Sequence, residues 1–367
     1  MGGVSAGAND FVLKSQPGSI EVSLTQERDH EPELPISTAV HAAVWNRSIW
    51  LGFVGDRPGS RAPFSCRPQC TIGSQDRNKR PFTGGTRVES ESQLSTDTVK
   101  LGFLGDVNGV PGRNVILQRL DDFRADHAPD LLVVNGENIR SGSGITPDLY
   151  AWLRKQGVDA VTLGDHVFRD QRILPQLEDP DEPISRPANL STSASGKRLI
   201  RLPLPGGGSL WVFTILGRIF VNLPANDPFA CVDELLDSIP EQNPLVMVEV
   251  HMEATSEKVA LAHHLDGRVA AVLGTHTHVP TADARVLPGG TAFITDVGMC
   301  GPYDSVIGRR KEAVLQHMRT GMHAPFDMAS GGEAMCGCVV TIRRQTGLAV
   351  SIERIQYDAD YSKPPFR

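Results

Sequence analysis

The pattern of apolar and polar residues changes at about residue 98, and from there it predicts alternating strands and helices. Short apolar runs bounded by turn residues are typical of buried strands, whereas apolar residues spaced three and four apart indicate helices. Strands are predicted at residues 99–106, 130–138, 158–166, 209–216, 243–251, 269–278 and 291–298. Helices are predicted at residues 112–127, 146–157 and 255–265. A terminal antiparallel hairpin is predicted at residues 337–344 and 348–358. This alternation predicts an α/β fold in which helices pack on a sheet.

The first 97 residues have a different composition, rich in Pro, Ser, Gly and charged residues, with only short apolar stretches. Such a segment buries too little apolar surface to offset the conformational entropy that is lost on folding. We therefore predict that residues 1–97 are a disordered N-terminal extension and that residues 98–360 form the folded domain.

The sequence LGFVGD at residues 51–56 is nearly repeated as LGFLGD at residues 101–106. The second copy is followed by a turn and a helical pattern, whereas the first is followed by prolines without apolar periodicity. Similarity this short, without a shared downstream pattern, does not indicate a structural repeat. We therefore expect Asp106 to be functional and treat Asp56 as a chance resemblance.

The net charge, the apolar runs and the cysteine spacing limit the classes of function that this chain can have. The 367 residues carry a net charge of −7, so no broad nucleic-acid surface and no stable binding of a duplex are expected. No apolar run approaches the roughly 20 residues of a membrane helix, and the N-terminus lacks the pattern of a signal peptide. The six cysteines have neither zinc-site nor disulfide spacing. These features predict a cytoplasmic protein without a membrane partner. A small phosphate-bearing substrate remains compatible with the acidic charge if metal ions supply positive charge.

Six side chains that can bind metals follow the predicted strands. They are Asp106, Glu137, Asp165, His251, His276 and His278. Because the carboxyl ends of parallel strands meet at one edge of a sheet, these side chains should converge there. In an extended strand, His276 and His278 would point the same way and face one site. This mixed set of carboxylates and imidazoles predicts two metal ions, with iron, manganese or zinc favoured over magnesium or calcium.

The residues next to these ligands leave alternatives open. Glu137 either bridges two cations with its two oxygens or belongs to a capped turn. Asn138 can donate a hydrogen bond to a substrate. His166 should point away from Asp165 if the strand continues, whereas a turn there would let it serve as a general acid.

The stretch GDVNGVPG at residues 105–112 resembles a glycine-rich phosphate-binding loop. The spacing of Gly102, Gly105, Gly109 and Gly112 fits neither the dinucleotide-binding pattern nor the P-loop pattern. We therefore expect no nucleotide site of those kinds, and we expect these glycines to let the backbone pass close to the metals.

Several motifs together resemble the YmdB-like family of bacterial metallophosphoesterases, from about Lys100 to Tyr357. The motifs are GFLGDVNGVPGR, NGENIRSGSGIT, LGDHVFRD, RPANL, HMEATSEKVAL and LDGRVAAVLGTHTHVPTADARVLPGGTAFITDVGMCGPYDSVIG. The resemblance implies a calcineurin-like fold, a four-layer α-β-β-α sandwich with a dinuclear metal site, usually iron, at the carboxyl ends of strands. It also implies hydrolysis of small phosphodiesters, most of all 2′,3′-cyclic nucleotides.

Matched by position, the resemblance makes all six strand-end residues metal ligands, with Glu137 as the bridge and with Asn138 and His166 as catalytic residues. One position departs from the family, which has Gly-Asn-His where this chain has Gly164-Asp165-His166. A carboxylate adds negative charge, so it should hold the cations more tightly and weaken their pull on phosphate and on bound water.

These observations lead to a hypothesis in which a metal-bound hydroxide attacks phosphorus. His166 would protonate the departing ribose oxygen, and Asn138 would steady a phosphoryl oxygen. Two alternatives stay open, a regulatory or binding protein with a weakly active or vestigial metal site, and a phosphomonoesterase that uses the same site. The sequence also leaves the oligomeric state open, a homo-oligomer included.

Overall fold

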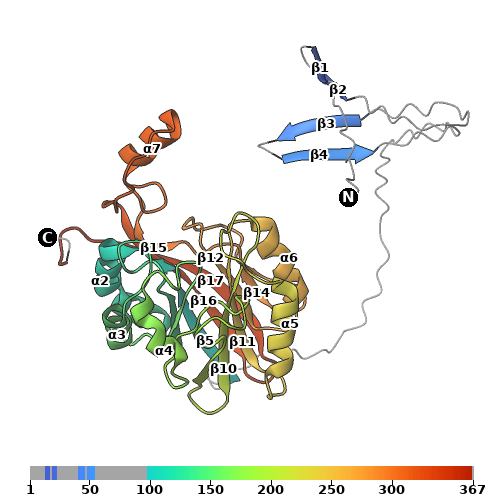
Figure 1. Cartoon of the computed structure of the whole chain (residues 1–367). Helices are drawn as coiled ribbons and strands as arrows, with labels where there is room; N and C mark the ends of the chain where they lie inside the picture. The colour runs from blue at the N-terminus through green and yellow to red at the C-terminus, as the bar shows by residue number, and fades with distance from the viewer. Residues whose placement is uncertain (1–12, 17–18, 23–39, 46–47, 54–96, 366–367) are drawn as a thin grey trace, which may run out of the picture. The chain divides into compact units, whose positions relative to one another are not determined.

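The computed structural model describes residues 13–16, 19–22, 40–45, 48–53 and 97–365 (Figure 1). The chain divides into two units, residues 1–84 and residues 85–367. The described residues of the first unit form two antiparallel hairpins, which are β1 (Leu13–Gln16) with β2 (Ser19–Val22) and β3 (Val40–Trp45) with β4 (Ser48–Phe53). Asp56 lies outside the described residues. Most of residues 1–96 also lie outside the described residues. We therefore keep two statements as predictions, that the folded domain begins at residue 98 and that the extension before it is disordered.

The second unit contains a mixed seven-stranded sheet, with the order β6-β15-β16-β5-β7-β8 and with β17 paired to β16. Its strands are β5 (Thr98–Leu104), β6 (Asp106–Val107), β7 (Leu131–Asn135), β8 (Ala160–Thr162), β15 (Met299–Pro302), β16 (Glu333–Arg343) and β17 (Leu348–Asp358). Strands β5, β7 and β8 are parallel, whereas β16 is antiparallel to β5 and to β17. The predicted terminal hairpin is thus confirmed as β16 and β17.

A six-stranded sheet has the order β13-β14-β12-β11-β10-β9. Its strands are β9 (Ile200–Pro203), β10 (Ser209–Leu216), β11 (Leu245–His251), β12 (Ala271–Thr275), β13 (Arg285–Val286) and β14 (Ala292–Ile294). The four central strands are parallel, and the register places Leu216, His251 and Thr275 side by side at their carboxyl ends.

Apart from α7, the helices of this unit lie around the two sheets (Figure 1). The helices are α2 (Gly109–His127), α3 (Pro147–Lys155), α4 (Leu174–Glu178), α5 (Pro228–Ser238), α6 (Thr255–Leu265) and α7 (Lys311–Thr320), with a short 3-10 turn η1 (Gln171–Ile173). Helix α3 begins as its sequence predicts, because the Thr146 hydroxyl accepts the Leu149 N–H at 3.3 Å and Pro147 occupies the first turn. Helix α7 stands away from the body of the unit (Figure 1).

Three clusters of buried apolar residues hold the unit together. One cluster joins the two sheets, with Leu101 and Phe103 of β5 packed in the same core as Val212 of β10. A second core includes residues of α2 and α3, and a third includes residues of α5 and α6. Because side chains alternate along a strand, β5 contributes to two cores, with Leu101 and Phe103 in the first and Leu104 in the second. Burying each large apolar side chain stabilises such a fold by about 1.5–3 kcal/mol.

Several strands end earlier than the apolar pattern predicts, and three of them precede proposed site residues. Strand β7 ends at Asn135, β8 at Thr162 and β12 at Thr275, so the polar residues that follow lie in turns at the sheet edge. These turns allow backbone angles that a strand does not have. The φ values of His276 and His278 are 91° and 65°.

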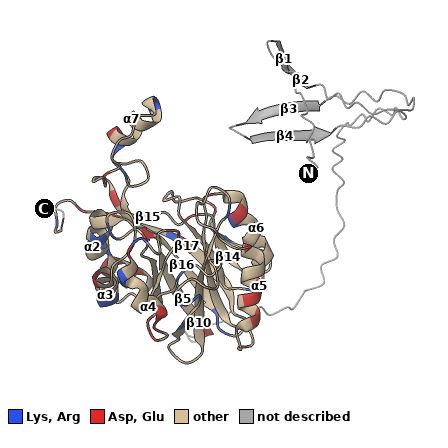
Figure 2. Ribbon diagram, viewed as in Figure 1, with Lys and Arg blue, Asp and Glu red and all other residues tan. Residues whose placement is uncertain are grey.

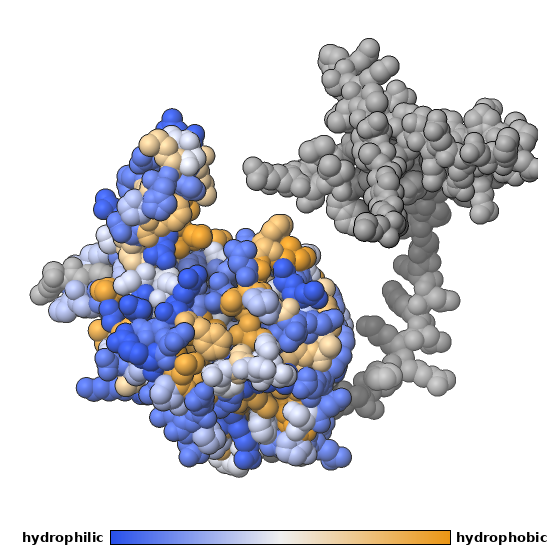
Figure 3. Space-filling model, viewed as in Figure 1, coloured by the Kyte–Doolittle hydropathy of each residue, from blue (hydrophilic) through white to orange (hydrophobic). Residues whose placement is uncertain are grey.

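Charged residues of both signs are distributed over the described part of the chain (Figure 2), and the face seen in Figure 3 mixes polar and apolar residues. Among the described residues, no helix is both long enough and apolar enough to cross a membrane.

Candidate metal centre

Four of the six predicted ligands form one tight group at the carboxyl edge of the strands. Glu137, Asp165, His251 and His276 each offer a ligand atom, and these atoms all lie within 4.8 Å of one another. The Nε2 atom of His251 lies 3.1 Å from Asp165 Oδ1, 3.3 Å from Glu137 Oε1 and 3.0 Å from His276 Nδ1. Carboxylate oxygens and imidazole nitrogens that converge in this way are the donor set of transition-metal sites.

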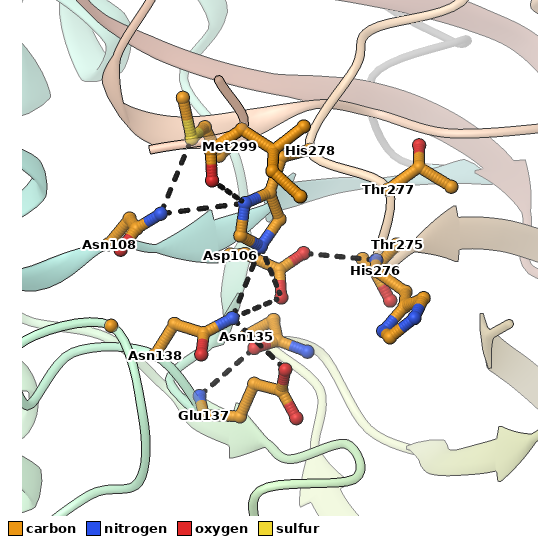
Figure 4. Close-up of polar contacts among 12 residues, drawn as sticks. Asp106, Asn108, Asn135, Glu137, Asn138, Thr275, His276, Thr277, His278 and Met299 are labelled. Atoms are coloured by element: carbon orange, nitrogen blue, oxygen red, sulfur yellow. Dashed lines mark hydrogen bonds and ion pairs between the residues drawn. The ribbon is translucent and has the colours of Figure 1, made fainter. Parts of the chain in front are cut away.

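The other two predicted ligands, Asp106 and His278, form a second group that Asn138 links to Glu137 (Figure 4). The Asn138 Nδ2 atom lies 3.0 Å from Glu137 Oε1, 3.3 Å from Asp106 Oδ1 and 3.2 Å from His278 Nε2. His278 Nε2 and Asp106 Oδ1 are 3.8 Å apart. The structure therefore brings all six side chains together, in two groups that meet at Glu137.

The two histidines of the His276-Thr277-His278 segment reach the site by a route that the sequence did not predict. An extended strand was expected here, but both histidines have positive φ because β12 has already ended. The turn is held by the His276 N–H, which donates to Asp106 Oδ2 at 3.2 Å, and by the Thr277 N–H, which donates to Asp296 Oδ2 at 3.1 Å. The shared direction of the side chains thus comes from these contacts and not from strand alternation.

His166 lies in a turn, the second of the two arrangements considered for it. Its backbone N–H donates to Glu137 Oε2 at 3.1 Å, and its Nδ1 atom lies 2.8 Å from Asn138 Oδ1. Its side chain is 24% exposed, in contrast to the fully buried His251. His166 is therefore an imidazole at the site that solvent or substrate can reach.

The carboxylates and histidines of this cluster shift one another's pKa values, against the effect of burial. Burial alone would raise the pKa of Glu137, but the charge of His251 and a hydrogen bond from His166 outweigh it and lower the pKa to about 2. Burial is outweighed in the same way at Asp106 and Asp165, whose pKa values fall below their usual range through contacts with histidines. The neighbouring carboxylates raise the pKa of His251 well above its ordinary value, against the effect of burial. The carboxylates are thus ionised and need positive charge beside them.

The glycine at the centre is Gly164, a residue that the sequence reasoning passed over. A Cβ atom on Gly164 would lie 2.2 Å from His251 Nε2 and 2.3 Å from Glu137 Oε2. Two of the glycines that were expected beside the metals, Gly105 and Gly112, pack against the carbonyl groups of Gly298 and Cys300. Their small size serves the close approach of the chain after β5 and of α2 to the segment around β15, and their role near the metals stays a prediction.

A buried ion pair behind the site was also missed by the sequence reasoning. Lys258 Nζ donates to Asp296 Oδ2 at 2.8 Å and to the Thr275 carbonyl oxygen at 2.6 Å, and both charged side chains are fully buried. Asp296 in turn accepts the N–H and hydroxyl hydrogen bonds of Thr277. The pair therefore holds the turn that carries His276 and His278.

Comparisons with known proteins agree with this site. A family model described as YmdB-like protein matches residues 103–355. A 2′,3′-cyclic-nucleotide 2′-phosphodiesterase of Bacillus subtilis (strain 168) is 39% identical over 263 residues, which cover 72% of this chain and 98% of that protein. A putative phosphatase/phosphodiesterase of Mycoplasma pneumoniae is 34% identical over 276 residues, which cover 72% of this chain and 95% of that protein.

Solved structures show the same similarity. The crystal structure of a hypothetical protein from Thermus thermophilus is 42% identical with a TM-score of 0.66, and the match covers 71% of this chain and 100% of that one. The crystal structure of a novel phosphatase from Mycoplasma pneumoniae is 32% identical with a TM-score of 0.67, covering 72% of this chain and 98% of that one. Since the family model and these relatives span most of the second unit, the chain belongs to the YmdB-like family.

Proposed function

We propose that this protein is a dinuclear-metal phosphodiesterase that acts on small phosphodiesters, with 2′,3′-cyclic nucleotides as the expected substrates. Its broad class, a hydrolytic phosphoesterase, is that of its family relatives. One observation supports the proposal of two metals and a diester substrate. The four-residue group and the pair formed by Asp106 and His278 meet at Glu137.

The residues present fit a pair of cations. His251 Nε2 faces the Asp165 and Glu137 oxygens at 3.1 and 3.3 Å, and such lone pairs face one another only with a proton or a cation between them. Glu137, Asp165, His251 and His276 would hold one cation, and Asp106 and His278 would hold a second, with Glu137 shared. Mixed imidazole and carboxylate ligands suit iron, manganese or zinc.

When bound, such cations would offset phosphate charge and lower the pKa of a coordinated water toward neutrality. The protein's own residues supply the proton for the leaving oxygen. His166 Nδ1 lies 2.8 Å from Asn138 Oδ1, so the Nδ1–H group is held and Nε2 remains as the proton donor. The Asn138 amide nitrogen lies between the two ligand groups, where it can donate to a phosphoryl oxygen.

The cyclic-nucleotide substrate comes from the name of the Bacillus subtilis relative. The same relationship supports a calcineurin-like four-layer α-β-β-α arrangement, which the three apolar clusters favour. We also propose a cytoplasmic location, on the basis of cysteines whose spacing suits a reducing compartment.

The test is hydrolysis of 2′,3′-cyclic AMP by the purified protein, with bound metals quantified in the same sample. Replacing the bridging residue, Glu137→Gln, should remove both metal and turnover. Glu234→Gln is the matched control, because Glu234 is an exposed residue that pairs with Arg198 and is outside the four-residue group. Full turnover by the Glu137→Gln variant would contradict the proposal. Faster hydrolysis of monoesters than of cyclic or linear diesters would favour a phosphomonoesterase instead.

The second candidate function is that of a regulatory or binding protein with a weakly active site. Asp165 favours it, because a carboxylate at this position lies 3.1 Å from His251 Nε2 and adds negative charge to the site. Bound metal without turnover in the natural protein, restored by Asp165→Asn, would support this second candidate.

A further inference from the structure

Glu249 is a buried carboxylate beside the site that the proposed chemistry does not use. It precedes His251 by two residues on β11, and its side chain is completely buried. It accepts three hydrogen bonds, from Asn135 Nδ2 at 2.6 Å, Thr275 Oγ1 at 2.7 Å and Thr214 Oγ1 at 2.8 Å. The first two reach the same oxygen, Oε1.

A backbone group fixes the direction of the Asn135 hydrogen bond, and the direction of the Thr275 hydrogen bond follows when Glu249 is ionised, because an ionised carboxylate only accepts. The Glu137 backbone N–H can only donate, and it donates to Asn135 Oδ1 at 3.0 Å, so Asn135 Nδ2 must face Glu249. Thr275 has one hydroxyl proton, and it is given to Glu249. The Thr275 oxygen can then only accept from His251 Nδ1, which lies 2.9 Å away.

We infer that Glu249, acting through the Thr275 hydroxyl, fixes His251 in the tautomer with its proton on Nδ1. The Nε2 lone pair of His251 then points into the group formed with Glu137, Asp165 and His276. Histidines that bind metals commonly donate their second ring N–H to a fixed acceptor, which sets the ring's orientation and its basicity. Glu249 and Thr275 are thus positioning residues, and the inference rests on the proposed metal site.

A purely structural role for the same contacts must be separated from this one. Glu249 ties Asn135 of the seven-stranded sheet to strands of the six-stranded sheet, so its loss would lower stability in either case. Two threonine hydroxyls donate to Glu249. Only the positioning role predicts that the loss of one of them weakens metal binding and that the loss of the other does not. Thr275 and Thr214 offer this comparison, since both are fully buried and both donate to Glu249, but Thr275 also contacts His251.

The experiment measures zinc dissociation constants of the full chain by competition with a chelator. Thr275→Val should raise the dissociation constant by about 10- to 100-fold, the usual effect of losing a residue that orients a ligand. The matched control Thr214→Val, and Thr275→Ser, which restores the hydroxyl, should stay within about threefold of the natural protein. Equal weakening by Thr275→Val and Thr214→Val would overturn the inference but leave the metal site standing. A natural protein that binds no zinc would overturn both.

A second measurement needs no variant. In the zinc-loaded protein with 15N-labelled histidine, NMR should show a slowly exchanging proton on His251 Nδ1. A His251 ring protonated on Nε2 would overturn the inference whatever the stability of the variants.

Discussion

At the scale of single residues, Asp165 is the position where we predicted a departure from the family motif. Its Oδ1 atom lies 3.1 Å from His251 Nε2 and 3.4 Å from His276 Nδ1, so it lies within the ligand group. Burial opposes its charge, yet hydrogen bonds from His251 and His276 lower its pKa below the usual range. The position therefore carries a full negative charge beside the proposed cations.

We predict that Asp165→Asn weakens metal binding and raises turnover once metal is saturating. One charge at about 4 Å is worth about 1 kcal/mol even in water, so the metal dissociation constant should rise by at least about fivefold. The turnover number should rise because the cations then attract phosphate more strongly. Metal titration and initial rates with 2′,3′-cyclic AMP check both. Glu234→Gln, which removes an exposed charge that pairs with Arg198 outside the ligand group, is the control. Tighter metal binding by Asp165→Asn would contradict the prediction.

The histidines predict how metal affinity depends on pH. Neighbouring carboxylates raise the pKa of His251 above its ordinary 6.5, although burial acts in the opposite direction. Below this raised pKa the metal-free imidazole is protonated, and a cation must displace the proton to bind Nε2. Affinity should therefore increase with pH from about 6 upward, by about tenfold per unit for each displaced proton, and level off above the raised pKa. Calorimetry in two buffers of different ionisation enthalpy should detect the released protons, whereas an affinity unchanged between about pH 6 and 8 would contradict this linkage.

At the scale of elements, the turn after β12 depends on an ion pair that comes from helix α6 and the end of β14. We predict that Lys258→Met lowers the free energy of unfolding by about 3–5 kcal/mol, because Asp296 is left charged and buried without its partner. The variant should also bind metal more weakly, since the pair supports His276 and His278 through Thr275 and Thr277. Urea unfolding of the metal-free protein measures the first effect.

Lys311→Met is the matched control for this prediction. Lys311 pairs with Asp304 at the surface, where both side chains are largely exposed. Exposed pairs of this kind contribute only about 0–1 kcal/mol. Similar losses of stability in the two variants would show that the buried pair has no special role in the turn.

Much of the fold follows from local patterns, and the exceptions have physical causes. The apolar runs at β5, β7, β10, β11 and β12 identified buried strands, and the Thr-Pro sequence identified the start of α3. Helices α5 and α7 and the short strands β9, β13 and β15 were not predicted. Strands of two to four residues are too short for periodicity, and their pairing is decided by contacts distant in sequence.

The site shows a similar division. Polar residues placed after apolar runs identified all six side chains that meet at Glu137, because strand ends converge at a sheet edge. The supporting residues were missed, although Glu249 left a signal, a carboxylate inside the apolar run VMVEVH. Its partners Asn135, Thr214 and Thr275 are on three other strands, so no local pattern could reveal that its charge is satisfied.

At the scale of the molecule, the site exists only where the two sheets come together. Residues from Asp106 to His278 contribute, and contacts such as Asp106 with the His276 N–H at 3.2 Å join chain segments from the two sheets. The hydrogen bond between Asn135 of β7 and Glu249 of β11 also joins the two sheets. Metal binding should therefore depend on the second unit as a whole.

This organisation leads to a prediction about the first 96 residues. The family model matches residues 103–355, and the Thermus thermophilus structure is covered along 100% of its length by 71% of this chain. The matched part thus corresponds to a whole relative. The second unit should then fold and bind metal without residues 1–96. The cut must spare Asp97, whose carbonyl accepts the Arg344 N–H at 2.9 Å and whose carboxylate lies 3.5 Å from Arg343.

We predict that a chain of residues 97–367 melts within about 2 °C of the full protein, because the retained core is unchanged. Its metal content and its kcat/KM for 2′,3′-cyclic AMP should stay within about twofold. A second deletion that also removes residues 97–99 is the control, since it takes away Asp97 and the first residues of β5, including the buried Val99. That control should melt several degrees lower, because the first two residue pairs of β5 with β16 and the contribution of Val99 to the core between the sheets are lost. Loss of turnover in residues 97–367 with an unchanged melting temperature would instead assign the N-terminal segment a direct part in catalysis.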